Sequence, residues 1–160
     1  MRTAKRVAVT VAAFAVSLSG MTVIATSAQA SAGDCPANRV CLWENENQDG
    51  AGGIFIVQDK ASNGRYCDLD LNDNTFSNGH RVSDATSSVY NKTGYNIFLF
   101  QNPSPYRFAA KAEIFYVAPN KKVNSLKNVA VTHGNYFPGN NGWTYPNVNF
   151  SDKTSAVCDA

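Results

Sequence analysis

The stretch Trp43-Glu44-Asn45-Glu46-Asn47-Gln48-Asp49-Gly50 decides the fold of this chain. It begins at the end of Val40–Glu44, a run rich in the β-branched and aromatic residues that are typical of strands. It ends in Asp49-Gly50, a dipeptide that tolerates the positive φ of tight turns. A second apolar run, Ile54–Gln58, follows directly. The segment therefore predicts two strands joined by a turn.

The same strand and turn signals recur along most of the chain. Further strands are expected at Arg65–Leu69, Ser88–Tyr90, Ile97–Gln101, Ile114–Val117 and Val129–Thr132. Turn dipeptides that contain Gly separate these runs. Only the stretch 108–113 has a helix-forming composition, and it is too short to be stable alone. This pattern predicts an all-β sandwich or barrel.

A weak internal repeat indicates two similar halves. Ser87-Ser88-Val89-Tyr90-Asn91 recurs as Asn124-Ser125-Leu126-Lys127-Asn128, 37 residues later. Each copy would combine a turn-closing hydroxyl with a side chain directed to the core. Two such units predict two Greek-key motifs packed into one sandwich.

The first 30 residues have the three parts of a secretory signal. Basic residues come first, an apolar stretch begins at Val7, and the small-residue triplet Ala28-Gln29-Ala30 follows. The alternative is an uncleaved membrane anchor, but polar residues and glycine interrupt the apolar run before the roughly 20 residues that a spanning helix needs. We therefore expect a signal peptide over 1–30, one domain over 31–160, and a secreted, extracellular protein without membrane contact after cleavage.

Charge excludes one class of partner. The leader holds three of the 14 basic residues and none of the 12 acidic ones, so the remainder has 11 basic and 12 acidic residues and a net charge of −1. Nucleic acids and anionic membranes attract clustered positive charge. We therefore expect no nucleic-acid partner, and we expect a monomer.

All four cysteines lie in the part expected to be exported, where pairing is the default. They are Cys35, Cys41, Cys67 and Cys158. Three connectivities are open. The short spacing of Cys35 and Cys41 suits a local bridge, which leaves Cys67 to join Cys158. No Cys-x-x-Cys motif or His pair supports the competing use, a zinc site.

The opening stretch resembles the first hairpin of a βγ-crystallin Greek key. In that family an aromatic residue covers the core, a glycine supplies unusual backbone angles, and a later serine pins the hairpin. The resemblance implies these roles for Trp43, Gly50 and Ser88, while Gln48 stands where a second aromatic residue is usual. The second copy matches less well, although its echo includes Ser125.

Within this group, residues 35–43 are similar to the opening of the actinobacterial peptidase-inhibitor family typified by the Streptomyces metalloproteinase inhibitor. Val117-Ala118-Pro119 followed by Ser125-Leu126 resembles a segment late in that domain. The resemblance covers most of 34–126 and implies a secreted inhibitor that is not an enzyme and that occludes the cleft of a protease, with metalloproteases as the implied target. The family's second cysteine-bracketed loop has no counterpart here, because no cysteine lies between Cys67 and Cys158.

The segment in the place of that loop is the candidate for protease contact. It contains Pro103, Ser104, Pro105, Tyr106 and Arg107. A rigid loop whose entropy is already lost binds tightly, and two prolines provide stiffness. The alternative is an ordinary turn in which proline protects a sheet edge.

Calcium is the second candidate ligand, with no other cofactor expected. Crystallin-like motifs often supply oxygen atoms from an acidic residue and a nearby Ser or Thr. The windows 83–88 and 120–125 match in part, with Asp84 and Ser87 as the expected ligands. The alternative is that these hydroxyls stabilise hairpins through hydrogen bonds. A secreted calcium-binding or killer-toxin-like crystallin module is therefore the alternative to the inhibitor.

Other functions have less support in the sequence. Catalytic and nucleotide-binding motifs are missing, and His80 and His133 each stand beside Gly in an expected turn. A cell-wall glycan-binding module is a further alternative, because sugar rings stack on exposed aromatic residues. The candidates are Tyr136, Phe137, Trp143 and Tyr145.

Overall fold

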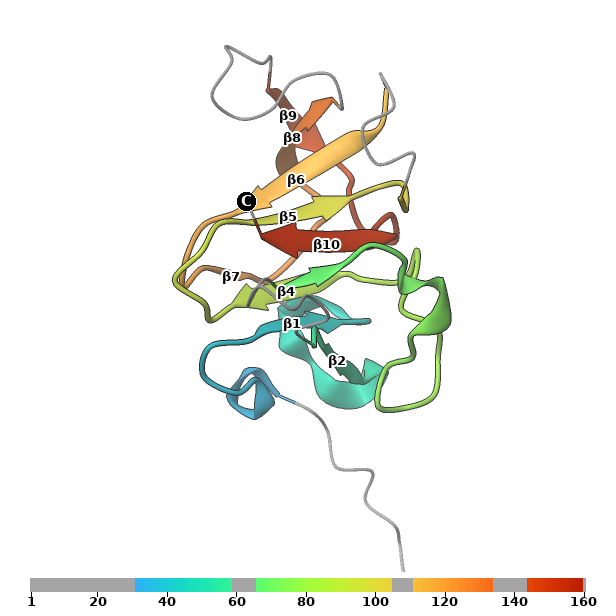
Figure 1. Ribbon diagram of the computed structural model, residues 1–160, viewed down its shortest axis with the longest axis vertical. Coiled ribbons are helices and arrows are strands. Elements are labelled where there is room, and N and C mark those ends of the chain that lie inside the picture. Colours follow the sequence, from blue (N-terminus) through green and yellow to red (C-terminus); the bar gives the residue numbers. More distant parts are fainter. Residues whose placement is uncertain (1–30, 59–65, 105–110, 134–143, 160) are drawn as a thin grey trace, which may run out of the picture.

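A computed structural model describes residues 31–58, 66–104, 111–133 and 144–159. The described residues form ten strands in two antiparallel sheets, and they contain no α-helix. Figure 1 shows the strands running across the long axis of the molecule, one sheet above the other. The all-β class is therefore confirmed, whereas the signal peptide expected at 1–30 lies outside the described residues.

The smaller sheet, sheet A, has the strand order β2-β1-β4-β7. β1 pairs with both β2 and β4, so the predicted strand–turn–strand unit is confirmed. Its strands are β1 (Val40–Trp43), β2 (Ile54–Ile56), β4 (Ser88–Asn91) and β7 (Lys122–Val123).

The larger sheet, sheet B, has the strand order β3-β10-β5-β6-β8-β9. The C-terminal strand β10 lies inside the sheet, where it pairs with β3 on one side and β5 on the other. The strands are β3 (Cys67–Asp68), β5 (Ile97–Phe100), β6 (Glu113–Val117), β8 (Val129–His133), β9 (Tyr145–Val148) and β10 (Ala156–Asp159).

All seven predicted strands are present, and three others were not predicted, namely β7, β9 and β10. Half of the helix considered at 108–113 falls outside the described residues; the described half, 111–113, is not helical, and Glu113 begins strand β6 instead. One short 3₁₀ turn, η1 (Ala32–Asp34), precedes β1, and three lie between strands: η2 (Glu46–Gln48), η3 (Gly50–Gly52) and η4 (Leu71–Asp73).

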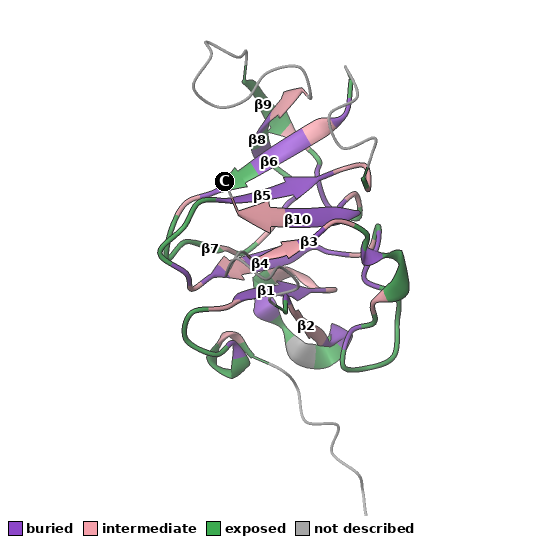
Figure 2. Cartoon of the chain, in the orientation of Figure 1, coloured by how far each residue is buried: buried purple, intermediate pink, exposed green. Residues whose placement is uncertain are grey.

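The main core lies between the two sheets. Because side chains alternate along a strand, Val40 and Leu42 of β1 face this core, while Cys41 and Trp43 face the other side of sheet A. Sheet B contributes Leu99, Phe115 and other apolar residues, and Figure 2 shows the buried residues along the strands of both sheets. The other core residues are Val57, Leu71, Phe76, Val82, Val89, Ile97, Val117, Leu126, Val129, Val131, Phe150 and Val157.

Each outer face also carries a small apolar cluster. On sheet A, the Cys35–Cys41 disulfide packs with Trp43, which is fully buried. On sheet B, Phe98 and Phe100 pack with Ile114, Ala156 and half-buried Cys158. The two disulfides therefore lie on opposite outer faces of the sandwich.

Candidate functional site

The hairpin between β1 and β2 is fixed by a buried serine. The Ser88 hydroxyl donates a hydrogen bond to the Asn45 carbonyl at 2.6 Å and accepts one from the Gln48 amide at 3.2 Å. It thereby holds the 3₁₀ turn η2 over the start of β4. Within η2, Asn47 and Gln48 have positive φ values of 59° and 51°, so the left-handed angles of this hairpin do not fall on glycine alone. Gly50, expected to supply them, begins the next turn, η3.

Gln48 replaces an aromatic residue and makes a different contact. Its side chain is almost fully buried, and its amide donates to the Val123 carbonyl at 2.9 Å. The hairpin is thus tied to β7 at the edge of sheet A. This hydrogen bond offsets the burial of the side-chain nitrogen, whereas the buried side-chain oxygen has no partner among the described residues.

Ser125 does not repeat the arrangement of Ser88. It is half-buried, and its hydroxyl accepts a hydrogen bond from the Lys127 amide at 3.2 Å. Its neighbour Leu126 is fully buried, and the Leu126 amide donates to the Ser87 carbonyl at 3.0 Å. The two copies of the sequence repeat are therefore hydrogen-bonded to each other, but Ser88 and Ser125 make different contacts.

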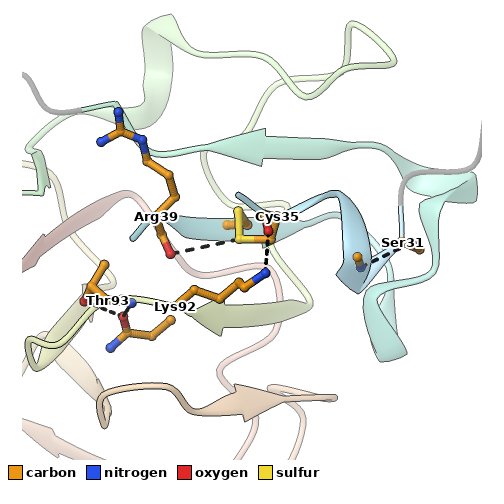
Figure 3. The surroundings of a disulfide bond; sticks show 8 residues. Ser31, Cys35, Arg39, Lys92 and Thr93 are labelled. Carbon is orange, nitrogen blue, oxygen red and sulfur yellow. Dashed lines mark hydrogen bonds between the residues drawn. A yellow bond between two sulfur atoms is a disulfide. The ribbon is translucent and has the colours of Figure 1, made fainter. Parts of the chain in front are cut away.

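The disulfides follow the predicted pairing, Cys35 with Cys41 and Cys67 with Cys158. The first closes a short loop ahead of β1, and the Lys92 ammonium donates to the Cys35 carbonyl there at 2.7 Å (Figure 3). The second joins β3 to β10, which are neighbours in sheet B.

The proposed protease-contact segment is described only at Pro103 and Ser104. The Ser104 amide donates to the Leu69 carbonyl at 2.9 Å, which anchors the beginning of the segment to the residue after β3. Pro105, Tyr106 and Arg107 lie outside the described residues.

Asp84 and Ser87, the expected calcium ligands, belong to two clusters rather than one. Asp84 accepts a hydrogen bond from Ser155 at 2.8 Å. Ser87 donates to Asp152 at 3.1 Å and also contacts the Ser151 hydroxyl at 2.9 Å. Within the described residues the two expected ligands therefore do not share a cluster.

These two clusters are related as a pseudo-twofold pair. The Asp84 amide donates to the Thr154 carbonyl and the Asp152 amide to the Thr86 carbonyl, both at 3.0 Å. Asp84 and Asp152 both have positive φ, 56° and 59°. Thr86 and Thr154 are both fully buried, with hydroxyls that have no hydrogen-bond partner among the described residues.

A second repeat in the sequence, different from the one with a spacing of 37 residues, corresponds to these two clusters. Ser83-Asp84-Ala85-Thr86-Ser87 recurs as Ser151-Asp152-Lys153-Thr154-Ser155, an Ser-Asp-x-Thr-Ser pattern before β4 and again before β10. The second calcium window was expected at 120–125, but the segment that meets Asp84 is 151–155.

The remaining candidates for chemistry are scattered. Among the described residues, no three His, Cys, Asp or Glu side chains gather where they could hold a metal ion. His80 is an exposed imidazole whose Nδ1 lies 2.8 Å from a carboxylate oxygen of Glu44. His133 stacks on Tyr145 with ring centroids 4.3 Å apart.

The aromatic residues considered for glycan binding are only partly described. Tyr145 is exposed on β9, whereas Tyr136, Phe137 and Trp143 lie outside the described residues. Within the described part of the chain, no helix is long and apolar enough to cross a membrane.

The fold and its cross-links define a disulfide-bonded, two-sheet all-β protein. Residues 28–105, just under half of the chain, match the model of peptidase inhibitor family I36. This is the family of the Streptomyces metalloproteinase inhibitor that the opening cysteine motif resembles, so the resemblance is confirmed. The family is a non-enzymatic class and implies a βγ-crystallin-like fold. No curated protein and no solved structure gives a significant match.

Proposed function

We propose that this protein is a secreted inhibitor of extracellular metalloproteases that blocks the protease cleft with a rigid loop. The observation that carries the proposal is the match of residues 28–105 to a peptidase inhibitor family. The two disulfides support secretion, because such bonds persist in oxidising compartments. We also propose that the leader is cleaved after Ala30. Residues 31–160 then form one domain of two Greek-key motifs.

The segment from Pro103 to Arg107 is the sequence-based candidate for the blocking loop. Its support is the pair of prolines, which restrict the unbound backbone, and the anchoring of Ser104 on the Leu69 carbonyl. A segment that is ordered before binding loses little entropy on binding, which is the requirement for a tight, slowly cleaved inhibitor.

The test is inhibition of a panel of secreted metalloproteases and serine proteases. The protein is produced with its leader, purified from the medium, and checked by N-terminal sequencing for cleavage after Ala30. We expect stoichiometric inhibition of at least one thermolysin-like metalloprotease. Inhibition of serine proteases alone would correct the target class, and activity against neither class would overturn the proposal.

Calcium binding is the second candidate function, and the paired Asp–Ser clusters favour it. One cluster would place a cation near the Asp84 carboxylate and the Ser155 hydroxyl, the other near Asp152 and Ser87. Oxygen donors of this kind suit a hard cation. Because each cluster holds a single carboxylate, we expect calcium to bind weakly, with a Kd on the order of 10⁻⁴–10⁻³ M.

Calorimetric titration with CaCl₂ tests this second function, with MgCl₂ as the competing ion. The wild type should bind calcium with this weak affinity and melt at a higher temperature when calcium is present. An Asp84→Asn, Asp152→Asn double variant should lose both effects. Equal calcium response in the two proteins would place the cation elsewhere, and no response in the wild type would refute calcium binding.

A further inference from the structure

The turn between β4 and β5 presents an exposed aromatic side chain. This turn, residues 92–96, connects Asn91 to Ile97. Tyr95 in the turn is 57% exposed, the highest value among the large hydrophobic side chains that the structure describes. In Figure 1 the turn lies at the left end of the sandwich, whereas the segment after β5 leaves at the right end.

A buried asparagine holds this turn from inside. Asn91 is fully buried, and its side-chain amide donates to the Tyr95 carbonyl at 2.8 Å. The same amide also reaches the carbonyls of Val117, the last residue of β6, and of Ala118, at 3.1 and 3.0 Å. Its oxygen accepts hydrogen bonds from the amide and the hydroxyl of Thr93. The turn is therefore fastened to the body of the sandwich through one side chain.

Thr93 completes the support. It is 1% exposed, and its hydroxyl accepts a hydrogen bond from the Tyr95 amide at 3.2 Å. Both backbone polar groups of Tyr95 are therefore bound by side chains, the carbonyl by Asn91 at the end of β4 and the amide by Thr93 in the turn. The exposed ring thus stands on a backbone that is fixed on both sides.

The first disulfide loop packs beside the turn. The Lys92 amide donates to the Arg39 carbonyl at 2.9 Å, and the Lys92 ammonium donates to the Cys35 carbonyl. Figure 3 shows the Lys92 side chain extending to Cys35, with Thr93 farther from the disulfide. The loop closed by the Cys35–Cys41 bond therefore holds Lys92, the first residue of the turn.

The surface around Tyr95 has the side chains that dominate protein interfaces. The ring of Tyr66 lies 6.4 Å from that of Tyr95, and the Arg39 guanidinium lies over Tyr66 at 5.8 Å from its centroid. On another side, the Tyr116 hydroxyl donates to the Asn96 side chain at 2.6 Å. Tyrosine and arginine are enriched among the residues that carry most of the binding energy in protein complexes.

We infer that the β4–β5 turn is a protease-binding loop of this inhibitor, with Tyr95 as the anchor that enters an apolar specificity pocket in the cleft of a metalloprotease. The inference rests on the proposed function. The family match favours it, because residues 28–105 include the whole turn but end inside the segment 103–107. A pre-ordered backbone under an exposed aromatic ring is the arrangement that lowers the entropy cost of binding.

Alanine substitution at Tyr95 tests the anchor in the full, disulfide-bonded protein. The inhibition constant of Tyr95→Ala is compared with that of the wild type on a metalloprotease that the wild type inhibits. We expect Tyr95→Ala to weaken inhibition by about 30-fold or more, the effect of an interface hot spot. Tyr95→Phe should retain most of it. Tyr145→Ala is the matched control, because Tyr145 is also exposed but lies on β9, and it should inhibit like the wild type.

Thr93→Val tests the support of the loop separately from its contact. This change keeps the shape of the buried side chain but removes the hydroxyl that binds the Tyr95 amide. We expect faster proteolytic cleavage within residues 92–96, measured by mass spectrometry of the protease mixture, together with a lower melting temperature, because the buried hydroxyl also donates to Asn91. A loss of melting temperature without faster cleavage would show a purely structural role for Thr93.

The possible outcomes distinguish failure of the loop assignment from failure of the proposed function. If the wild type inhibits no protease, the proposed function fails and the inference fails with it. If the wild type inhibits and Tyr95→Ala inhibits equally well, only the assignment of the loop is overturned. Loss of inhibition in a Tyr106→Ala, Arg107→Ala variant but not in Tyr95→Ala would transfer the contact to the opposite end of β5.

Discussion

The Asp84 carboxylate accepts a hydrogen bond from Ser155, 71 residues later in the chain, at 2.8 Å. Asp152 and Ser87 make the reciprocal contact at 3.1 Å. The loops before β4 and β10 therefore hold each other at one end of the sandwich, one loop belonging to sheet A and the other to sheet B. This contact joins the sheets independently of either disulfide.

The reciprocal contact predicts energetic coupling between Asp84 and Ser155. Because Ser155 is buried and its hydroxyl binds a carboxylate, Ser155→Ala should lower the free energy of unfolding by about 1–2 kcal/mol. A double-mutant cycle of Asp84→Ala and Ser155→Ala, measured by urea unfolding, should give a coupling energy of at least about 0.5 kcal/mol. The pair Asp84→Ala and Ser88→Ala serves as the control and should be nearly additive. Equal coupling in both cycles would argue against a specific contact.

Removal of the Ser88 hydroxyl should destabilise the hairpin. Ser88→Ala leaves the Asn45 carbonyl and the Gln48 amide without their partner, and this should cost about 1–3 kcal/mol of unfolding free energy. Ser125→Ala is the control, because that hydroxyl is only half-buried and binds the Lys127 amide and the surface side chain of Glu46, and it should cost less than about 0.5 kcal/mol. Similar losses in the two variants would contradict the distinct role of Ser88.

The two disulfides should differ in their contributions to stability. Cys67–Cys158 spans 91 residues and Cys35–Cys41 only 6. By loop-closure entropy, the long-range bond contributes about 4–5 kcal/mol and the local one about 2–3 kcal/mol. Replacing each pair with alanine and measuring unfolding by denaturant should show the larger loss for Cys67 and Cys158. The reverse order would indicate that residual structure in the unfolded chain dominates.

Stability should respond to acid and to base through one surface ion pair. The Lys127 ammonium lies 2.7 Å from the Glu46 carboxylate, and its hydrogen bond lowers the pKa of Glu46 below 4.5 and raises the pKa of Lys127 above 10.5. The contribution of Glu46 is complete above pH 4.5 and is lost as pH falls through its lowered pKa. The contribution of Lys127 is complete below pH 10.5 and is lost as pH rises through its raised pKa.

A Glu46→Gln variant measures this pH dependence. Its urea midpoint should fall less steeply than that of the wild type on both the acid and the alkaline side, because the variant has no carboxylate to pair with Lys127. Because both groups lie at the surface, added salt should reduce the difference between the proteins. Identical pH curves for wild type and variant would show that the ion pair is energetically neutral.

The strands that the sequence did not predict have weak local signals for physical reasons. β9 contains Pro146 and Asn147, which are poor in interior strands but acceptable here because β9 is the edge of sheet B. β7 has two residues and is the edge of sheet A. β10 lies inside its sheet, yet only Ala156 and Val157 give it apolar character. Its place is set by pairing with β3 and β5, which no short window of sequence records.

The candidate site was predictable in its parts but not in its pairing. Asp84 and Ser87 lie in the window 83–88 that the sequence indicated, but their hydrogen-bond partners come from residues 151–155, far along the chain. The dipeptide Thr93-Gly94 indicates the turn itself, but no motif indicates its rigidity, which depends on the Asn91 side chain meeting the carbonyls of Val117 and Ala118. Such contacts are properties of the assembled sandwich.

The position of β10 shows that the segment that matches the family model is smaller than the folded unit. The match ends at residue 105, yet strand β10 fills the gap between β3 and β5, both of which lie inside the matched region. A fragment cut at that boundary would retain only β3 and β5 of the larger sheet, without the strand that lies between them, and Cys67 would have no disulfide partner. Recombination or engineering that treats 28–105 as a portable module would therefore transfer a sequence without the means to close its own sheet.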